Sequence, residues 1–164
     1  MNDLELQRLS AAVGERLKAK SATVTCAESC TGGWIAKVFT DISGSSAWFE
    51  RGFVTYSNGA KQELVGVTAA SLAQYGAVSE AVVREMAQGA QHAAQADYAV
   101  SVSGIAGPDG GSAGKPVGTV WFGFAAPDGV VTAKRQQFQG DREAVRRQSV
   151  AFALQTLQDD FLAN

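Results

Sequence analysis

A short segment from Ala27 to Gly33, with the sequence Ala-Glu-Ser-Cys-Thr-Gly-Gly, has the residue types best suited to chemistry in this chain. It follows an apolar run at 22–26 and precedes another that begins at Trp34, so we expect a strand, a tight turn and the start of a helix. Ser29 is then close to the free N–H groups and the positive dipole end of that helix, where negative charge is stabilised. The segment suits a nucleophilic serine beside an oxyanion hole or a phosphate site. Its structural alternative is a helix N-cap serine followed by turn glycines.

A serine nucleophile needs a base, and histidine is scarce in this chain. The single histidine, His92, falls in a predicted helix among Ala and Gln residues, which makes it a poor base for a catalytic triad. Lys61 is the candidate base, because a strand-end Tyr56 and a lysine in the first turn of the next helix can point into one pocket. The alternative for Lys61 is an exposed lysine on a helix surface. A lysine base needs its pKa to fall from ~10.4 toward ~7–8, and partial burial is a sufficient cause.

Two cysteines, Cys26 and Cys30, flank Ser29. Cys30 is an alternative nucleophile, since thiolates attack amides well. A strand end and a turn four residues later do not give disulfide geometry, so we expect no bridge. With one histidine in the chain the cysteines also lack partners for a zinc site, and we predict no metal.

The longest glycine-rich stretch runs from Gly104 to Gly114 and follows Ser103. Such a loop allows the backbone to approach a ligand closely, although a flexible strand connection is the alternative. Ser103 and Gly104 are therefore candidate binding residues. The stretch lacks the G-x-x-x-x-G-K-[ST] pattern, so ATP binding is not indicated.

Arg142 and Arg146 lie four residues apart, at the N-terminus of the last predicted helix. Like charges at this spacing repel each other, and cations at a helix N-terminus oppose its dipole. A bound anion such as a phosphate would explain this arrangement. The alternative is a solvated pair beside Asp141 and Glu143.

Hydrophobic periodicity predicts the elements that position these residues. We expect a single domain over residues 1–164, of α/β class, in the form of a three-layer α/β/α sandwich with a mixed, mainly parallel sheet that ends in an antiparallel hairpin. The predicted strands are 23–26, 52–56, 98–102, 117–125 and 130–138. In the first predicted helix, one apolar face is marked by Leu6, Leu9, Val13 and Leu17. The other predicted helices cover 33–40, 60–65, 69–74, 80–95 with Ser79 as N-cap, and 142–161 with Asp141 as N-cap.

Composition excludes several classes of function. The net charge of −2 argues against a nucleic-acid footprint. No apolar run approaches the ~20 residues that a membrane span needs. The acidic start, Met-Asn-Asp-Leu-Glu, does not resemble a signal peptide, so we expect a cytoplasmic protein.

Several motifs occur together in one order. Besides 27–33 and 142–146 they are Tyr-Ser-Asn-Gly-Ala-Lys at 56–61, Gly-Ala-Val-Ser-Glu at 76–80, Ser-Gly-Ile-Ala-Gly-Pro-Asp-Gly-Gly at 103–111 and Pro-Val-Gly-Thr-Val at 116–120. This ordered set resembles the C-terminal domain family of the competence/damage-inducible protein CinA, over roughly Leu6 to Leu162. It is most similar to the stand-alone bacterial members, which are nicotinamide-nucleotide amidases.

The resemblance implies a reaction and a role for each matching residue. The reaction is hydrolysis of the carboxamide of nicotinamide mononucleotide, with Ser29 as nucleophile, Lys61 as its base and Tyr56 as a hydrogen-bonding proton relay. Backbone N–H groups around Cys30 and Thr31 would receive the substrate's oxyanion, and Gly32 would be a further substrate-binding residue. Ser103, Gly104, Arg142 and Arg146 would bind the rest of the nucleotide, with Arg142 on its 5′-phosphate. The resemblance further implies no cofactor, and a homodimer.

Two other functions stay open at this point. One is an amidase or nucleotide hydrolase with a different substrate on the same scaffold. The other is a catalytically silent nucleotide-binding paralogue, against which the presence of Ser29, Tyr56, Lys61 and both arginines argues, because a degenerate copy would be expected to lose some of them.

Overall fold

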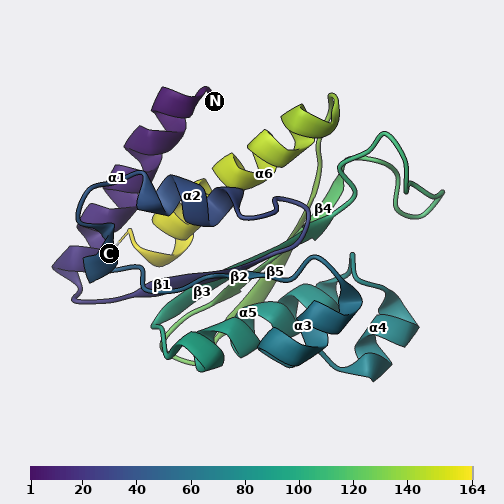
Figure 1. Ribbon diagram of the computed structural model, residues 1–164, viewed down its shortest axis with the longest axis horizontal. Coiled ribbons are helices and arrows are strands. Elements are labelled where there is room, and N and C mark those ends of the chain that lie inside the picture. The colour runs from purple at the N-terminus through teal and green to yellow at the C-terminus, as the bar shows by residue number, and fades with distance from the viewer. Residues whose placement is uncertain (164) are drawn as a thin grey trace.

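Five strands form one mixed sheet in the computed structural model, which describes residues 1–163 (Figure 1). The order is β2-β1-β3-β4-β5; β1 pairs in parallel with β2 and β3, whereas β4 is antiparallel to both β3 and β5. Every strand except β4 therefore runs in the same direction, which confirms the mixed, mainly parallel sheet with its terminal hairpin. The strands are β1 (Val24–Glu28), β2 (Phe53–Val54), β3 (Tyr98–Gly104), β4 (Thr119–Ala125) and β5 (Val131–Gln137).

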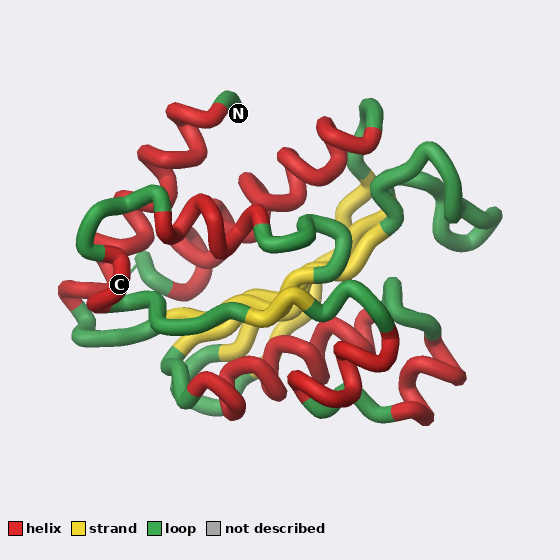
Figure 2. The backbone as a smooth tube through the Cα atoms, in the orientation of Figure 1, coloured by secondary structure: helices red, strands yellow, loops and turns green. Residues whose placement is uncertain are grey.

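Helices cover both faces of the sheet, as the expected three-layer sandwich requires (Figure 2). One layer consists of α1 (Asp3–Ala19), α2 (Trp34–Thr40) and α6 (Arg142–Thr156), with the short turns η1 (Ser45–Ala47) and η2 (Leu157–Phe161). The other layer consists of α3 (Asn58–Val65), α4 (Ala69–Tyr75) and α5 (Glu80–Ala94). No helix within residues 1–163 is both long and apolar enough to cross a membrane.

Because successive side chains of a strand point to opposite faces of the sheet, one apolar core lies on the α1/α2/α6 side and another on the α5 side. On β3, Val100 and Val102 face the α1/α2/α6 layer, whereas Ala99 and Ser101 face α5. The same alternation on β1 directs Glu28 to the α2 side, and the residue that follows it to the α3 side. Side chains at the carboxyl end of β1 thus enter two different layers.

Helix α3 packs close against α5 because Gly89, in α5, has no side chain. A Cβ atom at Gly89 would collide with the Val65 carbonyl group at the end of α3. This contact fixes the helix that carries Lys61, and the packing explains the otherwise unfavourable glycine inside α5.

Most element boundaries agree with the sequence predictions to within about two residues, and the differences have local causes. α3 begins earlier than expected because the Ser57 side chain caps it, accepting from the Ala60 N–H at 3.0 Å. The predicted last helix ends at Thr156 and continues as the π-helical turn η2. The predicted N-caps Ser79 and Asp141 are confirmed.

Candidate active site

Ser29 and Lys61 meet at the carboxyl end of β1. The Lys61 Nζ lies 3.1 Å from the Ser29 Oγ and donates to the Thr55 carbonyl at 2.8 Å. Both side chains are buried, with 8% of Ser29 and 1% of Lys61 exposed. The surface-lysine alternative is therefore wrong for Lys61, and the two side chains that the sequence paired for chemistry lie within hydrogen-bond distance.

Burial gives Lys61 the electrostatic character of a base. Desolvation lowers the pKa of its ammonium group below the ordinary value, because the charged form loses water. Within residues 1–163, Lys61 forms no salt bridge that would hold its proton. A lysine in such a site can accept the proton of an adjacent hydroxyl group.

The turn after Ser29 corrects two of the sequence expectations. Ser29 is not the N-cap of α2, because α2 begins at Trp34 and its N-cap position is occupied by Gly33, in left-handed backbone (φ 104°). Nor are the first N–H groups of α2 free: the Glu28 carboxylate accepts from the Ile35 and Ala36 N–H groups at 2.8 and 3.0 Å. Glu28 is a buried residue of the site that sequence reasoning missed. An acidic residue inside a buried strand, three before a threonine, was the available signal.

Backbone N–H groups that could bind an oxyanion are nevertheless present where the sequence predicted them, at Cys30 and Thr31. Within residues 1–163 the N–H groups of Cys30 and Thr31 donate to no other residue. The Arg146 side chain donates to the carbonyl groups of the same two residues, at 3.0 and 3.3 Å. Because a peptide unit is planar and trans, the Cys30 carbonyl group held by Arg146 directs the Thr31 N–H group the opposite way. The Ser29 carbonyl group, which accepts from the Gly32 N–H at 3.1 Å, orients the Cys30 N–H group in the same manner.

Gly32 lies close to the Arg146 side chain. Its backbone is left-handed (φ 59°), and a Cβ atom there would lie 3.3 Å from a terminal nitrogen of Arg146. The structure thus places Arg146 on the backbone of the Ser29 turn, and its predicted contact with the substrate stays a prediction.

The two thiols are buried and free. Burial raises the pKa of Cys30 to about 12 and raises that of Cys26 well above its ordinary value. A thiol with so high a pKa holds little thiolate at neutral pH, which disfavours Cys30 as the nucleophile.

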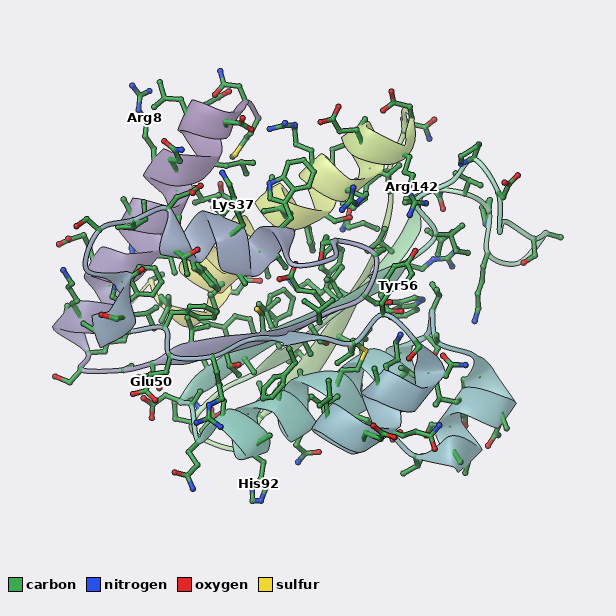
Figure 3. The ribbon with its side chains drawn as sticks, viewed as in Figure 1. Arg8, Lys37, Glu50, Tyr56, His92 and Arg142 are labelled. Atoms are coloured by element: carbon green, nitrogen blue, oxygen red, sulfur yellow. The ribbon has the colours of Figure 1, made fainter. Side chains whose placement is uncertain are left out.

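Tyr56 and Arg142 form the outer edge of the site (Figure 3). Arg142 donates to the Tyr56 hydroxyl at 3.4 Å and to the Gly107 carbonyl at 3.0 Å, so it joins the β2–α3 connection to the loop 105–118. Tyr56 is 63% exposed and, within residues 1–163, forms no hydrogen bond to Ser29 or Lys61. The relay role of Tyr56 stays a prediction.

Ser103 lies next to Ser29 in the sheet. β1 and β3 pair in parallel with Glu28 opposite Val102, and the Ser29 N–H donates to the Val102 carbonyl at 3.0 Å. Continuing this register sets Ser103, which is buried, beside Ser29 on the same face. Gly104 has a packing role as well, because a Cβ atom there would lie 2.6 Å from a Val120 methyl group.

The loop 105–118 extends away from the body of the molecule (Figure 1). Both ends of this loop and the first residues of α6 line a pocket that includes Pro108, Val117 and Arg142. A second pocket, lined by Gly32, Trp34 and Arg146, lies on the α2 side. Arg142 and Arg146 form no salt bridge within residues 1–163, so both guanidinium groups are available to an anionic ligand, and Asp141 and Glu143 line the same pocket as Arg142.

Comparison with known proteins identifies the family. The CinA C-terminal domain model matches residues 6–161. The chain belongs to the CinA C-terminal domain family. Nicotinamide-nucleotide amidohydrolase PncC of Escherichia coli (strain K12) is 68% identical over 164 residues, covering 100% of this chain and 99% of that protein. PncC of Pseudomonas putida is 56% identical over 150 residues, covering 91% and 92%.

The solved structures of CinA-family proteins have the same fold. The crystal structure of a competence-damaged protein (CinA) superfamily protein from Klebsiella pneumoniae 700603 aligns with a TM-score of 0.93 at 41% identity, covering 99% of each chain. The family resemblance read from the motifs is thereby confirmed, together with the α/β fold.

Proposed function

We propose that this protein is a nicotinamide-nucleotide amidohydrolase, which converts nicotinamide mononucleotide and water into nicotinate mononucleotide and ammonia. The observation that carries the proposal is the buried contact between Lys61 Nζ and Ser29 Oγ at 3.1 Å. Relatives named for this activity cover almost the whole chain, which supports the substrate assignment. A silent paralogue would have no need to bury against a serine a lysine that forms no salt bridge within residues 1–163.

The first half of the reaction forms an ester on Ser29. Neutral Lys61 takes the Ser29 hydroxyl proton while the oxygen attacks the carboxamide carbon. The N–H groups of Cys30 and Thr31 stabilise the oxyanion of the tetrahedral intermediate. Lys61 then gives its proton to the amide nitrogen, the carbon–nitrogen bond breaks, and ammonia leaves.

The second half returns the enzyme to its starting state. Lys61 takes a proton from a water molecule, the resulting hydroxide attacks the ester carbon, and Ser29 leaves with the proton that Lys61 carries. Nicotinate mononucleotide is released, and the proposed scheme uses neither metal nor cofactor. Arg142 binds the 5′-phosphate, and Ser103 and Tyr56 contact the rest of the nucleotide.

Ammonia release from a panel of amides tests this proposal. We expect rapid release from nicotinamide mononucleotide and much slower release from nicotinamide riboside, nicotinamide and simple aliphatic amides. Equal rates across the panel would indicate an amidase of different specificity, and no release from any member would favour a nucleotide-binding protein without catalysis.

Assembly and location belong to the same proposal. We expect a homodimer that acts in the cytoplasm without binding nucleic acid. Light scattering of the purified protein measures its mass, and a monomer at micromolar concentration would contradict the expected dimer.

A further inference from the structure

Glu28 is a fully buried carboxylate for which the proposed reaction has no step. It is the last residue of β1, with 0% of its surface exposed. One oxygen accepts from the Thr31 hydroxyl at 2.6 Å and from the Ile35 N–H at 2.8 Å. The other accepts from the Ala36 N–H at 3.0 Å and lies 3.7 Å from the Cys26 thiol. A carboxylate, which only accepts, matches these four donors.

The main chain of Glu28 holds the opposite side of the site. Its carbonyl group accepts from the Thr55 N–H at 2.7 Å and from the Thr55 hydroxyl at 3.3 Å. The carbonyl group of Thr55 in turn accepts from the Lys61 Nζ at 2.8 Å. Glu28 thus contacts both the turn that carries the oxyanion donors and the strand end that holds the base.

The side-chain contacts decide which N–H groups are available to a ligand. The carboxylate occupies two N–H groups at the start of α2, and it holds Thr31 through its hydroxyl group. Arg146 holds the same turn from the other side, through the carbonyl groups of Cys30 and Thr31. Within residues 1–163 the N–H groups of Cys30, Thr31 and Gly33 donate to no other residue. Those of Cys30 and Thr31 follow Ser29 directly, and each is oriented by the carbonyl group of its own peptide unit, which accepts from the Gly32 N–H or from Arg146.

We propose that Glu28 is a positioning residue of the amidohydrolase: its carboxylate fixes the turn 29–33 so that the Cys30 and Thr31 N–H groups bind the oxyanion beside Ser29. The inference rests on the proposed function and adds a residue that does not touch the substrate. Because the oxyanion develops only in the transition state, a misplaced turn lowers kcat and leaves substrate binding unchanged.

Glu28→Gln is the primary test, since glutamine has the same shape but turns part of the acceptor group into an N–H donor that faces other donors. We expect kcat for nicotinamide mononucleotide to fall on the order of 100-fold, as for a misaligned or missing oxyanion donor, with KM within about threefold. Substrate affinity measured by calorimetry in a Ser29→Ala background should be the same with and without the Glu28→Gln substitution.

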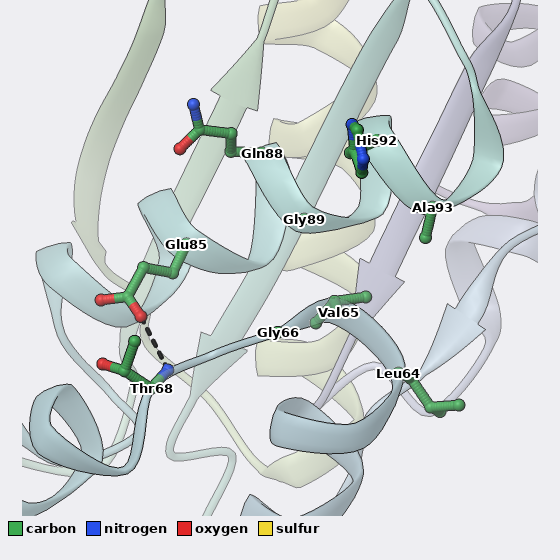
Figure 4. Close-up of a pocket in the computed structure, with 9 residues that line it drawn as sticks. All are labelled: Leu64, Val65, Gly66, Thr68, Glu85, Gln88, Gly89, His92 and Ala93. Carbon is green, nitrogen blue, oxygen red and sulfur yellow. Dashed lines mark hydrogen bonds between the residues drawn. The ribbon is translucent and has the colours of Figure 1, made fainter.

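Glu85→Gln is the matched control. The Glu85 carboxylate also accepts from a backbone N–H group, that of Thr68 at 2.8 Å, and from the Ser71 hydroxyl, but beside a pocket between α3 and α5 that contains none of the site residues (Figure 4). We expect its kcat to stay within about twofold of the wild type. A wild-type kcat in folded Glu28→Gln, an equal loss in Glu85→Gln, or a loss confined to KM would overturn the proposal.

A second pair of variants keeps the test decisive if Glu28→Gln does not fold. Thr31→Val removes the hydroxyl group that donates to Glu28, whereas Thr31→Ser keeps it. We expect kcat to fall about tenfold in the valine variant and to be largely recovered in the serine variant. Equal kcat in the two variants would contradict the positioning role. If the wild type releases no ammonia from the nucleotide, the proposed function itself fails, and that outcome is distinct from a normal rate in the Glu28 and Thr31 variants.

Discussion

The site has an inner and an outer part that differ in how firmly they are held. The inner part comprises residues 28–33 and Lys61; Ser29, Thr31 and Lys61 are buried there and hydrogen-bonded to neighbouring elements. The outer part comprises Tyr56, Arg142 and the loop 105–118, where Tyr56 and Arg142 are exposed and joined by a single long hydrogen bond.

This difference separates two tasks. Bond breaking needs a nucleophile, base and oxyanion donors in fixed positions, and burial in a close-packed interior supplies them. Recognition of a phosphate needs charge and reach, which a long arginine on the surface supplies. We therefore expect changes in the inner part to lower kcat, and changes in the outer part to raise KM and alter selectivity.

The largest effect is expected from Ser29→Ala. Removal of the nucleophile should lower kcat by a factor of about 10⁴ or more, with the fold retained, as measured by ammonia release and circular dichroism. Cys30→Ala is the control for the neighbouring thiol, whose pKa is raised to about 12, and should keep most of the activity. An inactive cysteine variant alongside an active serine variant would reverse the assignment.

Lys61 comes next. Both Lys61→Ala and Lys61→Arg should lower kcat by about 10²–10⁴, because arginine keeps its proton at any working pH. The arginine variant separates base catalysis from the presence of positive charge, and near-normal turnover in it would remove Lys61 from the role of base.

The pH dependence follows from the lowered pKa of Lys61. Since the base must be neutral, kcat/KM should rise with pH through the folded-state pKa, below the ordinary value of about 10.5. Between that pKa and about 10.5 the unfolded chain binds more protons, so the burial of Lys61 costs most stability below the folded-state pKa and less as pH rises.

Lys61→Met measures that cost directly. The variant should be more stable than the wild type at neutral pH, and its advantage in urea denaturation should shrink as pH approaches about 10.5. An advantage independent of pH would mean that Lys61 keeps an ordinary pKa in the folded protein.

The sequence alone led to some features of the fold and the inner part of the site, and missed others. The layers and the strand order at the hairpin followed from periodicity, and the pairing of Ser29 with Lys61 followed from the resemblance of the ordered motifs to a known family. The role of Glu28 did not, because its donors are backbone N–H groups of the next helix, and a sequence does not state where those groups point. The contacts of Arg146 were missed for a similar reason, since its partners are carbonyl groups over a hundred residues away.

In the outer part, Arg142→Ala should act on selectivity. Loss of a charge-assisted phosphate contact of ~2–4 kcal/mol corresponds to about 30- to 1,000-fold in kcat/KM for the mononucleotide, with little change for the riboside. Steady-state kinetics with both substrates measure the ratio. An equal loss on both would make Arg142 structural or catalytic, and the phosphate site would then be sought along residues 104–114.

The smallest effect is expected from the anchor of the loop 105–118. The Lys115 Nζ donates to the Tyr75 carbonyl at 2.7 Å, which ties the loop to the end of α4. Lys115→Met removes this exposed bond and keeps most of the aliphatic side chain, so the loop gains freedom while the inner part is untouched. We expect KM for the mononucleotide to rise about two- to fivefold with kcat unchanged, because ordering a freer loop weakens binding without altering the reacting groups. Lys134→Met, which removes a lysine from β5 that pairs with Asp160, controls for the loss of one surface charge and should leave both constants unchanged. A fall in kcat for Lys115→Met would mean that the loop also positions the reacting groups, and that inner and outer parts are coupled through β3 and its Ser103.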